Sequence, residues 1–335
     1  MNRKKHVTNK RWPRRGAASA VALGILSLSG AAARGEPQAT APVDSEASAG
    51  YQISVSVDLV VLNPVVHDRS GGFVNDLAEQ NFQIFEDGSR QNIRLFRHDD
   101  LPVTVGLIVD HSASMGRKLN EVITAARAFV KSSNPDDEMF VVNFNEKVTL
   151  GLPAATAFTN RPDELERAIL ATRVEGQTAL YDAVIEAQRR LLAGSREKKV
   201  LIVISDGGDN ASSHHLAEAL KIAEESGAVV YTIGIFDAED ADSNPGVLRH
   251  LARVTGGDAY FPEQLDEVTM VCERIARDIR NQYTIGYVST ATVKPGAWRS
   301  IRVAAKTTAN NKLLVRARAG YIAGGAALAK TGGGK

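Results

Sequence analysis

The stretch LIVDHSASMG, residues 107–116, joins the end of an apolar run to a polar turn. The run begins at Val103 and is almost continuously apolar, which is typical of a strand buried on both faces of a parallel sheet. An amphipathic helical pattern follows it over residues 119–130. Strands that alternate with such helices predict right-handed crossovers and a doubly wound, mostly parallel α/β sheet. Similar apolar runs recur at residues 139–143, 200–205 and 229–235.

Short β-patterned segments lie on both sides of this α/β region. Neither side has enough strands to bury a face alone, so we expect the two sides to join in one small β-sandwich module that carries the α/β domain as an insertion. The segments with this pattern are residues 53–66, 82–85, 92–96, 283–288, 299–305 and 313–317. We place the first half of the β-module at residues 51–100, the α/β domain at 101–281, the second half of the β-module at 282–322, and a disordered tail at 323–335.

The amino terminus has the composition of an export signal. Seven basic residues precede an uncharged run over residues 16–33 that ends in three alanines, which predicts a signal peptide at residues 1–33 with cleavage near Ala33. An uncleaved membrane anchor is the alternative, but the run is diluted by Ala, Ser and Gly, so we expect no stable membrane span after cleavage. Residues 34–50 are typical of a disordered linker. The protein is therefore expected to be periplasmic, cell-surface or secreted.

Charge and cysteine content exclude several classes of function. Loss of the seven basic residues leaves 33 Lys and Arg against 39 Asp and Glu, a formal charge of about −6. No basic patch remains for nucleic acid, so we expect no nucleic-acid partner. Cys272 is the only cysteine, which excludes an internal disulfide and a Cys-based zinc site. It lies on the apolar stripe of a helical pattern over residues 263–281 and is expected to be a buried core thiol.

Two polar loops follow predicted buried strands, a third lies just before the predicted helix from Ala179, and each carries oxygen ligands. Ligands bind α/β sheets of this kind in the crevice outside the carboxyl ends of the strands, where these loops are expected to meet. A shell of two carboxylates and three hydroxyls suits a hard cation, with Mg²⁺ preferred and Mn²⁺ or Ca²⁺ as substitutes. The candidate metal ligands are Asp110, Ser112, Ser114, Thr178 and Asp206, and the nearby residues expected to form the rim of the ligand surface are His111, Gln177 and Asp209.

The charge of this shell predicts its function. Two carboxylates neutralise a divalent cation without making the site negative, so an open coordination position can accept a carboxylate oxygen from an Asp or Glu of a protein or peptide ligand. We therefore expect a non-enzymatic, metal-dependent protein-binding or adhesion module of the cell envelope. Two alternatives remain: a structural envelope module with an incidental metal site, and a metal-dependent hydrolase. Against the hydrolase, the loops offer no obvious general base beside the metal.

These loops resemble the three metal-site loops of von Willebrand factor A domains, and the resemblance extends over about residues 101–281. It implies a Rossmann-like fold and a metal-ion-dependent adhesion site carried by the five ligands named above. The flanking segments at residues 82–88 and 283–287 are similar to a bacterial group of exported proteins related to this family. The segments that carry the resemblance of the loops are residues 107–116, 176–183 and 202–207.

Overall fold

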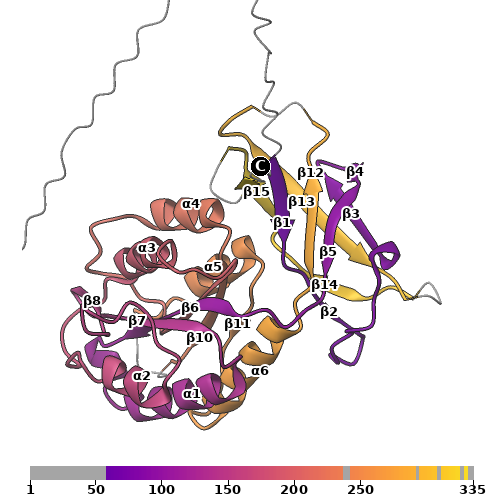
Figure 1. The fold of residues 1–335 in the computed structure, drawn as a ribbon. Coiled ribbons are helices and arrows are strands. Elements are labelled where there is room, and N and C mark those ends of the chain that lie inside the picture. The colour runs from indigo at the N-terminus through magenta and orange to yellow at the C-terminus, as the bar shows by residue number, and fades with distance from the viewer. Residues whose placement is uncertain (1–57, 237–241, 292–293, 308–310, 325–327, 331–335) are drawn as a thin grey trace, which may run out of the picture. The chain divides into compact units, whose positions relative to one another are not determined.

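The computed structural model describes residues 58–236, 242–291, 294–307, 311–324 and 328–330 (Figure 1). Its centre is a six-stranded sheet in the order β11-β10-β9-β6-β7-β8. Neighbouring strands run parallel, except that β8 pairs antiparallel with β7 at one edge. The bounds are Val103–Asp110 for β6, Glu138–Phe144 for β7, Val148–Leu150 for β8, Lys198–Ser205 for β9, Val229–Gly234 for β10 and Ala259–Tyr260 for β11.

Helices cover both faces of this sheet (Figure 1). On one face α1 packs against α2 and α6, and on the other α4 packs against α3 and α5. This arrangement confirms the doubly wound α/β fold. None of the helices in the described part of the chain is long and apolar enough to cross a membrane. The bounds are Leu119–Ser132 for α1, Pro162–Ile169 for α2, Leu180–Leu191 for α3, Leu216–Ser226 for α4, Pro245–Thr255 for α5 and Glu267–Arg280 for α6.

The core of the α/β domain lies between the central sheet and its two helical layers. Every residue of β6 is buried, as expected for a strand covered on both faces. Cys272 of α6 is only 2% exposed, which confirms the prediction of a core thiol, and burial raises its pKa to about 12. A thiol with so high a pKa is almost entirely protonated at neutral pH, and it acts as a small apolar side chain.

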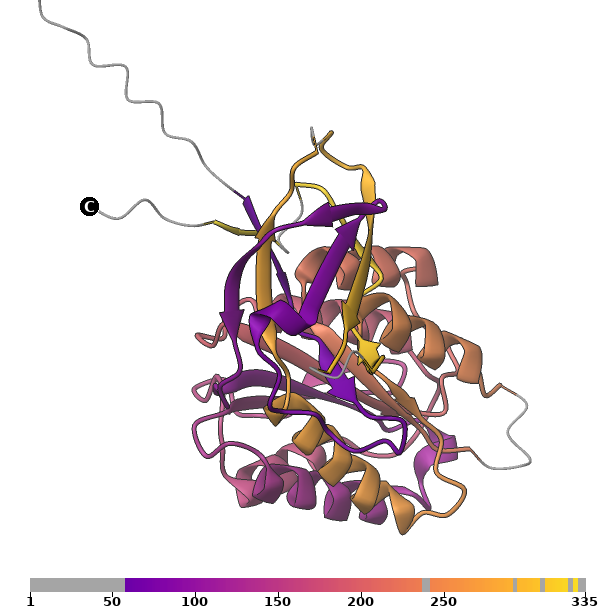
Figure 2. The same cartoon turned by 90° about the vertical axis from the view of Figure 1, so that its right-hand side faces the viewer.

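Strands from both ends of the described chain build the β-module (Figure 2). One sheet has the order β16-β1-β12-β5, a second has the order β15-β13-β3-β4, and β14 pairs with β2. Since each set combines strands from before and after the α/β domain, the α/β domain is inserted in a β-sandwich, as predicted. The bounds are Asp58–Leu62 for β1, Val65–His67 for β2, Phe82–Glu86 for β3, Ser89–Gln91 for β4, Ile93–Arg97 for β5, Thr284–Val288 for β12, Trp298–Ala305 for β13, Leu314–Arg316 for β14, Gly320–Ile322 for β15 and Leu328–Lys330 for β16.

The carboxyl-terminal tail differs from the prediction of a disordered segment at residues 323–335. Within it, Leu328–Lys330 forms β16, which pairs antiparallel with β1. The edge of β1 that faces away from β12 would otherwise leave its backbone groups unpaired, and a strand added there satisfies them. Composition alone does not reveal such an edge. The predicted signal peptide at 1–33 and linker at 34–50 lie outside the described residues, and the division of the chain at residues 101 and 281 stays a prediction.

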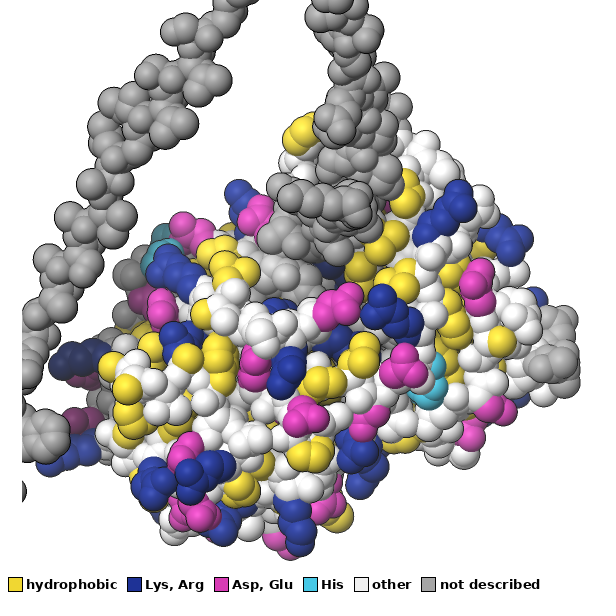
Figure 3. Space-filling model, viewed as in Figure 1, with side chains coloured by type: hydrophobic (Ala, Val, Ile, Leu, Met, Phe, Trp, Pro, Cys, Tyr) yellow, Lys and Arg dark blue, Asp and Glu magenta, His cyan; other side chains and the backbone are white. Residues whose placement is uncertain are grey.

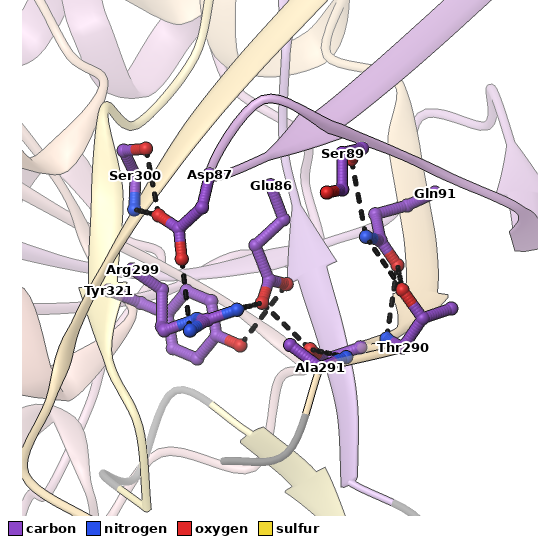
Figure 4. Close-up of polar contacts among 10 residues, drawn as sticks. Glu86, Asp87, Ser89, Gln91, Thr290, Ala291, Arg299, Ser300 and Tyr321 are labelled. Atoms are coloured by element: carbon purple, nitrogen blue, oxygen red, sulfur yellow. Dashed lines mark hydrogen bonds and ion pairs between the residues drawn. The ribbon is translucent and has the colours of Figure 1, made fainter. Parts of the chain in front are cut away.

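A buried carboxylate joins the two sheets of the β-module. The side chain of Glu86 is inaccessible to solvent, and its Oε1 accepts hydrogen bonds from Nε and Nη2 of Arg299 at 2.9 and 2.7 Å (Figure 4). Oγ of Ser289, which follows β12, donates to the same oxygen at 2.7 Å. Tyr321 Oη donates to Oε2 at 3.4 Å, and Asp87 pairs with Nη1 of Arg299 at 2.9 Å. Strands β3, β13 and β15 are therefore tied to the loop that leaves β12.

We predict that Glu86→Ala lowers the free energy of unfolding by about 3 kcal/mol, because removal of one partner of a buried ion pair leaves the other without compensation. Urea denaturation followed by circular dichroism measures this loss. Glu79→Ala removes an exposed carboxylate of the same β-module and should change the stability by no more than about 0.5 kcal/mol. Equal effects of the two substitutions would show that the Glu86 ion pair does not stabilise the sandwich.

Candidate metal centre

The carboxyl ends of β6 and β9 lie side by side and bring the first two predicted ligand loops together. The two strands are parallel neighbours, with Val109 paired to Ile204. At their ends Oγ of Ser205 donates to Oδ2 of Asp110 at 2.6 Å. Oδ1 of Asp110 accepts from the backbone N–H of Ser112 at 2.8 Å, so this carboxylate shapes its own turn. Asp110 is fully buried behind that turn.

A chain of hydroxyl and carboxylate contacts continues from this turn. Oγ of Ser112 lies 3.2 Å from Oγ of Ser114, which donates to Oδ2 of Asp206 at 2.7 Å. Oδ1 of Asp206 accepts from Gly208 N at 2.9 Å. Gly207, which lies between Asp206 and Gly208, has a φ of +81°, and a Cβ there would lie 2.4 Å from the carbonyl oxygen of Asn244. Only glycine fits at this position, and the resulting turn aims Asp206 towards the serines.

Thr178 is held beside the Asp206 loop by backbone contacts to Asn210. The N–H of Thr178 donates to Oδ1 of Asn210 at 2.9 Å, and its carbonyl oxygen accepts from the N–H groups of Asn210 and Ala211 at 3.0 Å each. The residue is 7% exposed. The third predicted ligand loop is therefore fixed against the second.

Two further carboxylates fasten the same loops around the start of α3. Asp209 Oδ2 accepts from the N–H of Tyr181 at 2.9 Å. Asp182 accepts from N and Oγ of Ser213 and from N of His214, and its Oδ1 lies 2.7 Å from Nδ1 of His214. Burial acts to raise the pKa of Asp182, but the hydrogen bonds from Ser213 and His214 outweigh it and lower that pKa to about 2. Asp182 is therefore ionised at neutral pH and holds the loop in place.

A pocket of about 270 Å³ opens where the three loops meet. Four of the five predicted ligands line it, and Asp110 lies buried next to Ser112 without reaching the pocket wall. The side-chain oxygens of the lining come from two serines, one threonine, two carboxylates and two amides. The complete lining is Ser112, Ala113, Ser114, Gly176, Gln177, Thr178, Asp206, Gly208, Asn210 and Asp242.

The three residues expected at the rim of the ligand surface have different positions. Gln177 is exposed and lines the pocket. His111 was wrongly expected there: it is fully buried, with Nδ1 3.1 Å from the carbonyl oxygen of Val109 and Nε2 2.9 Å from that of Ile169. Those two carbonyl groups draw the imidazole into the core. Asp209 does not line the pocket either, because its carboxylate caps the start of α3.

The electrostatics of the pocket suit a hard divalent cation. Burial raises the pKa of Asp110 to about 6; hydrogen bonds from Ser112 and Ser205 lower it, and the nearby carboxylate of Asp206 raises it. A positive charge bound nearby would stabilise the ionised form of Asp110. In the described part of the chain, no three His, Cys, Asp or Glu side chains group as a metal site. Any cation here would therefore depend on the hydroxyls, and the all-oxygen set fits Mg²⁺ chemistry.

Ser205, Asn210 and Asp182 are positioning residues whose contacts the sequence analysis missed. Ser205 ends β9 next to Asp110, and the alignment of the two strand ends was the signal that could have found it. Asn210 contacts Thr178, 32 positions away in the chain. Asp182 contacts Ser213 and His214, 31 and 32 positions away. No short sequence motif encodes these contacts.

The family model described as von Willebrand factor type A domain matches residues 105–271. Among solved structures, BatB from Bacteroides thetaiotaomicron is 18% identical with a TM-score of 0.43, over 52% of this chain and 98% of that one. The von Willebrand factor type A protein from Catenulispora acidiphila is 14% identical with a TM-score of 0.49, over 80% and 74%. Proximal thread matrix protein 1 from the mussel byssus, solved with a zinc-occupied MIDAS motif, is 16% identical with a TM-score of 0.47, over 59% and 50%. No curated protein matches the sequence.

We predict that Asp110→Asn raises the stability of the metal-free protein at pH 7 by on the order of 1 kcal/mol. The folded-state pKa of Asp110 is raised from 3.8 to about 6, so its contribution to stability is lost as the pH rises through this range. The neutral amide avoids that loss. With Mg²⁺ the wild type should gain stability by mass action and the variant should not. Thermal unfolding in chelator and in Mg²⁺ measures both effects.

Asp182→Asn is the matched control. Because the pKa of Asp182 is lowered to about 2, its carboxylate stabilises the fold above its ordinary pKa of 3.8, and this contribution is lost as the pH falls towards 2. Its replacement should therefore destabilise the protein at pH 7 both in chelator and in Mg²⁺. A large loss of stability for Asp110→Asn in chelator would instead assign Asp110 a structural role.

Proposed function

Residues 105–271 of this chain form a von Willebrand factor type A domain, and from that premise we propose a metal-dependent, non-enzymatic protein-binding function at the cell envelope. The proposed site holds one divalent cation, with Mg²⁺ preferred and Mn²⁺ or Ca²⁺ as substitutes. The contact between Ser114 and Asp206, 92 residues apart in the chain, is the observation that carries the proposal. The proposed metal ligands are Asp110, Ser112, Ser114, Thr178 and Asp206.

Each side chain has a distinct part in this proposal. Asp110 and Asp206 supply the two negative charges that balance a divalent cation, and Ser112 and Ser114 add oxygens without further charge. Thr178 completes the shell from the opposite loop. When bound, the cation offers a positive charge and an open coordination position to a partner's carboxylate oxygen. No histidine lines the pocket; of its two lining carboxylates, Asp206 is assigned to the cation and Asp242 accepts a hydrogen bond from Nδ2 of Asn210 at 3.5 Å.

The proposed partner is a protein or peptide that presents an Asp or Glu side chain. A pocket of about 270 Å³ is small for a drug-sized ligand and adequate for one carboxylate side chain. On the face shown in Figure 3, Lys and Arg side chains are mixed with Asp and Glu, so that face has no extended basic patch for nucleic acid. The basic and apolar amino terminus supports export to the periplasm, the cell surface or the medium.

Titration of Mg²⁺ into the exported chain, residues 34–335, should release or absorb heat with a stoichiometry of one. Asp110→Ala should abolish that signal, because it removes half of the balancing negative charge. Asp163→Ala removes an exposed carboxylate on α2 that does not line the pocket, and should leave the titration unchanged. Isothermal titration calorimetry makes the measurement, and an unchanged signal in Asp110→Ala would exclude the proposed site.

Capture from an envelope extract tests the binding function separately. The immobilised chain should retain a protein partner in Mg²⁺ and release it in chelator, and Ser114→Ala should retain much less of it. Glutamate-containing peptide in excess should compete for the site and its glutamine counterpart should not. Retention that is equal in Mg²⁺ and in chelator would contradict a metal-bridged contact even if the chain binds Mg²⁺.

A further inference from the structure

A second cavity, of about 710 Å³, lies along helix α5 and shares no lining residue with the candidate metal pocket. Helix α5 supplies Arg249 and Arg253 to its wall, and the segment around β11 supplies Asp258 and Phe261. Residues 315–317 of the β-module line it as well. The volume lies in the range of about 300 to 1,000 Å³ that ligand sites occupy. We call this cavity the α5–β11 groove.

One wall of the groove is an open edge of the central sheet. Strand β11 is the last strand in the order of that sheet, and among the described residues it pairs only with β10 (Figure 1). At this short edge the N–H of Ala259 already donates to Oδ1 of Asp258 at 3.0 Å, so it is not free to pair with an added strand. Ala259 belongs to this edge and lines the groove, so its small side chain leaves room for an incoming backbone.

The groove has an excess of positive charge. Arg249 and Arg253 are exposed, and neither lies within ion-pair distance of a carboxylate in the part of the chain that the structure describes. Arg249 stacks over the ring of Phe261, with its guanidinium carbon 4.4 Å from the ring centroid. Asp258, the acidic residue of the lining, is already paired with Arg316 at 2.6 Å. Among the described residues, these two arginines of the groove therefore have no acidic partner, in a chain whose predicted exported form is acidic.

The spacing of Arg249 and Arg253 along α5 matches the spacing of alternate side chains in an extended peptide. Residues four apart in a helix have Cβ atoms about 6 Å apart on one face. Alternate residues of an extended peptide lie on one face of the strand, roughly 6.6 Å apart. Carboxylates at alternate positions of an extended peptide therefore match Arg249 and Arg253. The residues between them would face away from the arginines, and Phe261, Val315 and Ala317 offer apolar contacts within the groove.

We propose that the α5–β11 groove binds an extended acidic peptide segment of a partner protein, with Arg249 and Arg253 contacting carboxylates two residues apart. Arginine forms two parallel hydrogen bonds with a carboxylate, which gives each anchor both direction and strength. This binding requires no cation, and it is independent of the metal-dependent function proposed above.

The probe is a fluorescein-labelled Ser-Glu-Val-Glu-Val-Ser peptide, and the readout is fluorescence anisotropy with residues 34–335 in chelator at low salt. Binding should be saturable and should weaken as the salt concentration rises. Arg249→Glu with Arg253→Glu should weaken it at least about 10-fold, because two attractive contacts become repulsive. Arg249→Gln with Arg253→Gln should give a smaller loss, and thermal unfolding establishes that each variant is folded.

Matched controls distinguish peptide binding at this groove from a general effect of net charge and from binding at the metal pocket. Arg189→Glu with Lys221→Glu makes the same change in charge on exposed positions of α3 and α4 and should leave peptide binding unchanged. Asp110→Ala should also bind the peptide normally. The proposal is wrong if the wild type shows no saturable binding, if the Ser-Gln-Val-Gln-Val-Ser peptide binds equally well, or if the α3–α4 control loses binding to the same extent.

Discussion

Strands β6 and β9 end side by side, and the candidate metal centre is built on the two loops that leave them. Both strands are buried on both faces and run parallel in register, so the chain leaves them at the same edge of the sheet. The hydrogen bond from Ser205 to Asp110 closes this junction at 2.6 Å. Because two rigid strands fix the starting points of two loops, the hydroxyls and carboxylates of these loops meet with little freedom of arrangement.

Much of this organisation could be predicted from the sequence because it follows local rules. A long apolar run indicates a buried strand, and oxygen-bearing residues directly after it lie at the ligand-binding edge. The positions of His111 and Asp209 could not be predicted in this way. Both are polar loop residues. Yet His111 is buried and contacts carbonyl groups of β6 and α2, and the carboxylate of Asp209 accepts from the N–H of Tyr181 at the start of α3. Such contacts depend on which loop ends lie opposite each other, and that is decided by tertiary packing.

Helix α5 connects the two regions for which we propose binding functions. Its N-cap residue, Asn244, donates from its backbone N–H to the carbonyl oxygen of Asp206 at 3.0 Å. Along the same helix, Arg249 and Arg253 line the α5–β11 groove. At its other end Gly256 adopts a φ of +86° and packs against the backbone of Arg318 in the β-module. The helix thus contacts a metal-site loop at one end and the β-module at the other.

The split sandwich also constrains the order in which the chain can assemble. Glu86 and Arg299 are partners although they lie 213 positions apart, and β3 pairs with β13 across a similar interval. Closure of so long a loop is entropically costly until the intervening segment is compact. The α/β domain, once folded, brings the ends of β5 and β12 together and removes most of that cost. We therefore expect the first strands to remain exposed until synthesis of the chain is nearly complete, and the last strands to finish the fold.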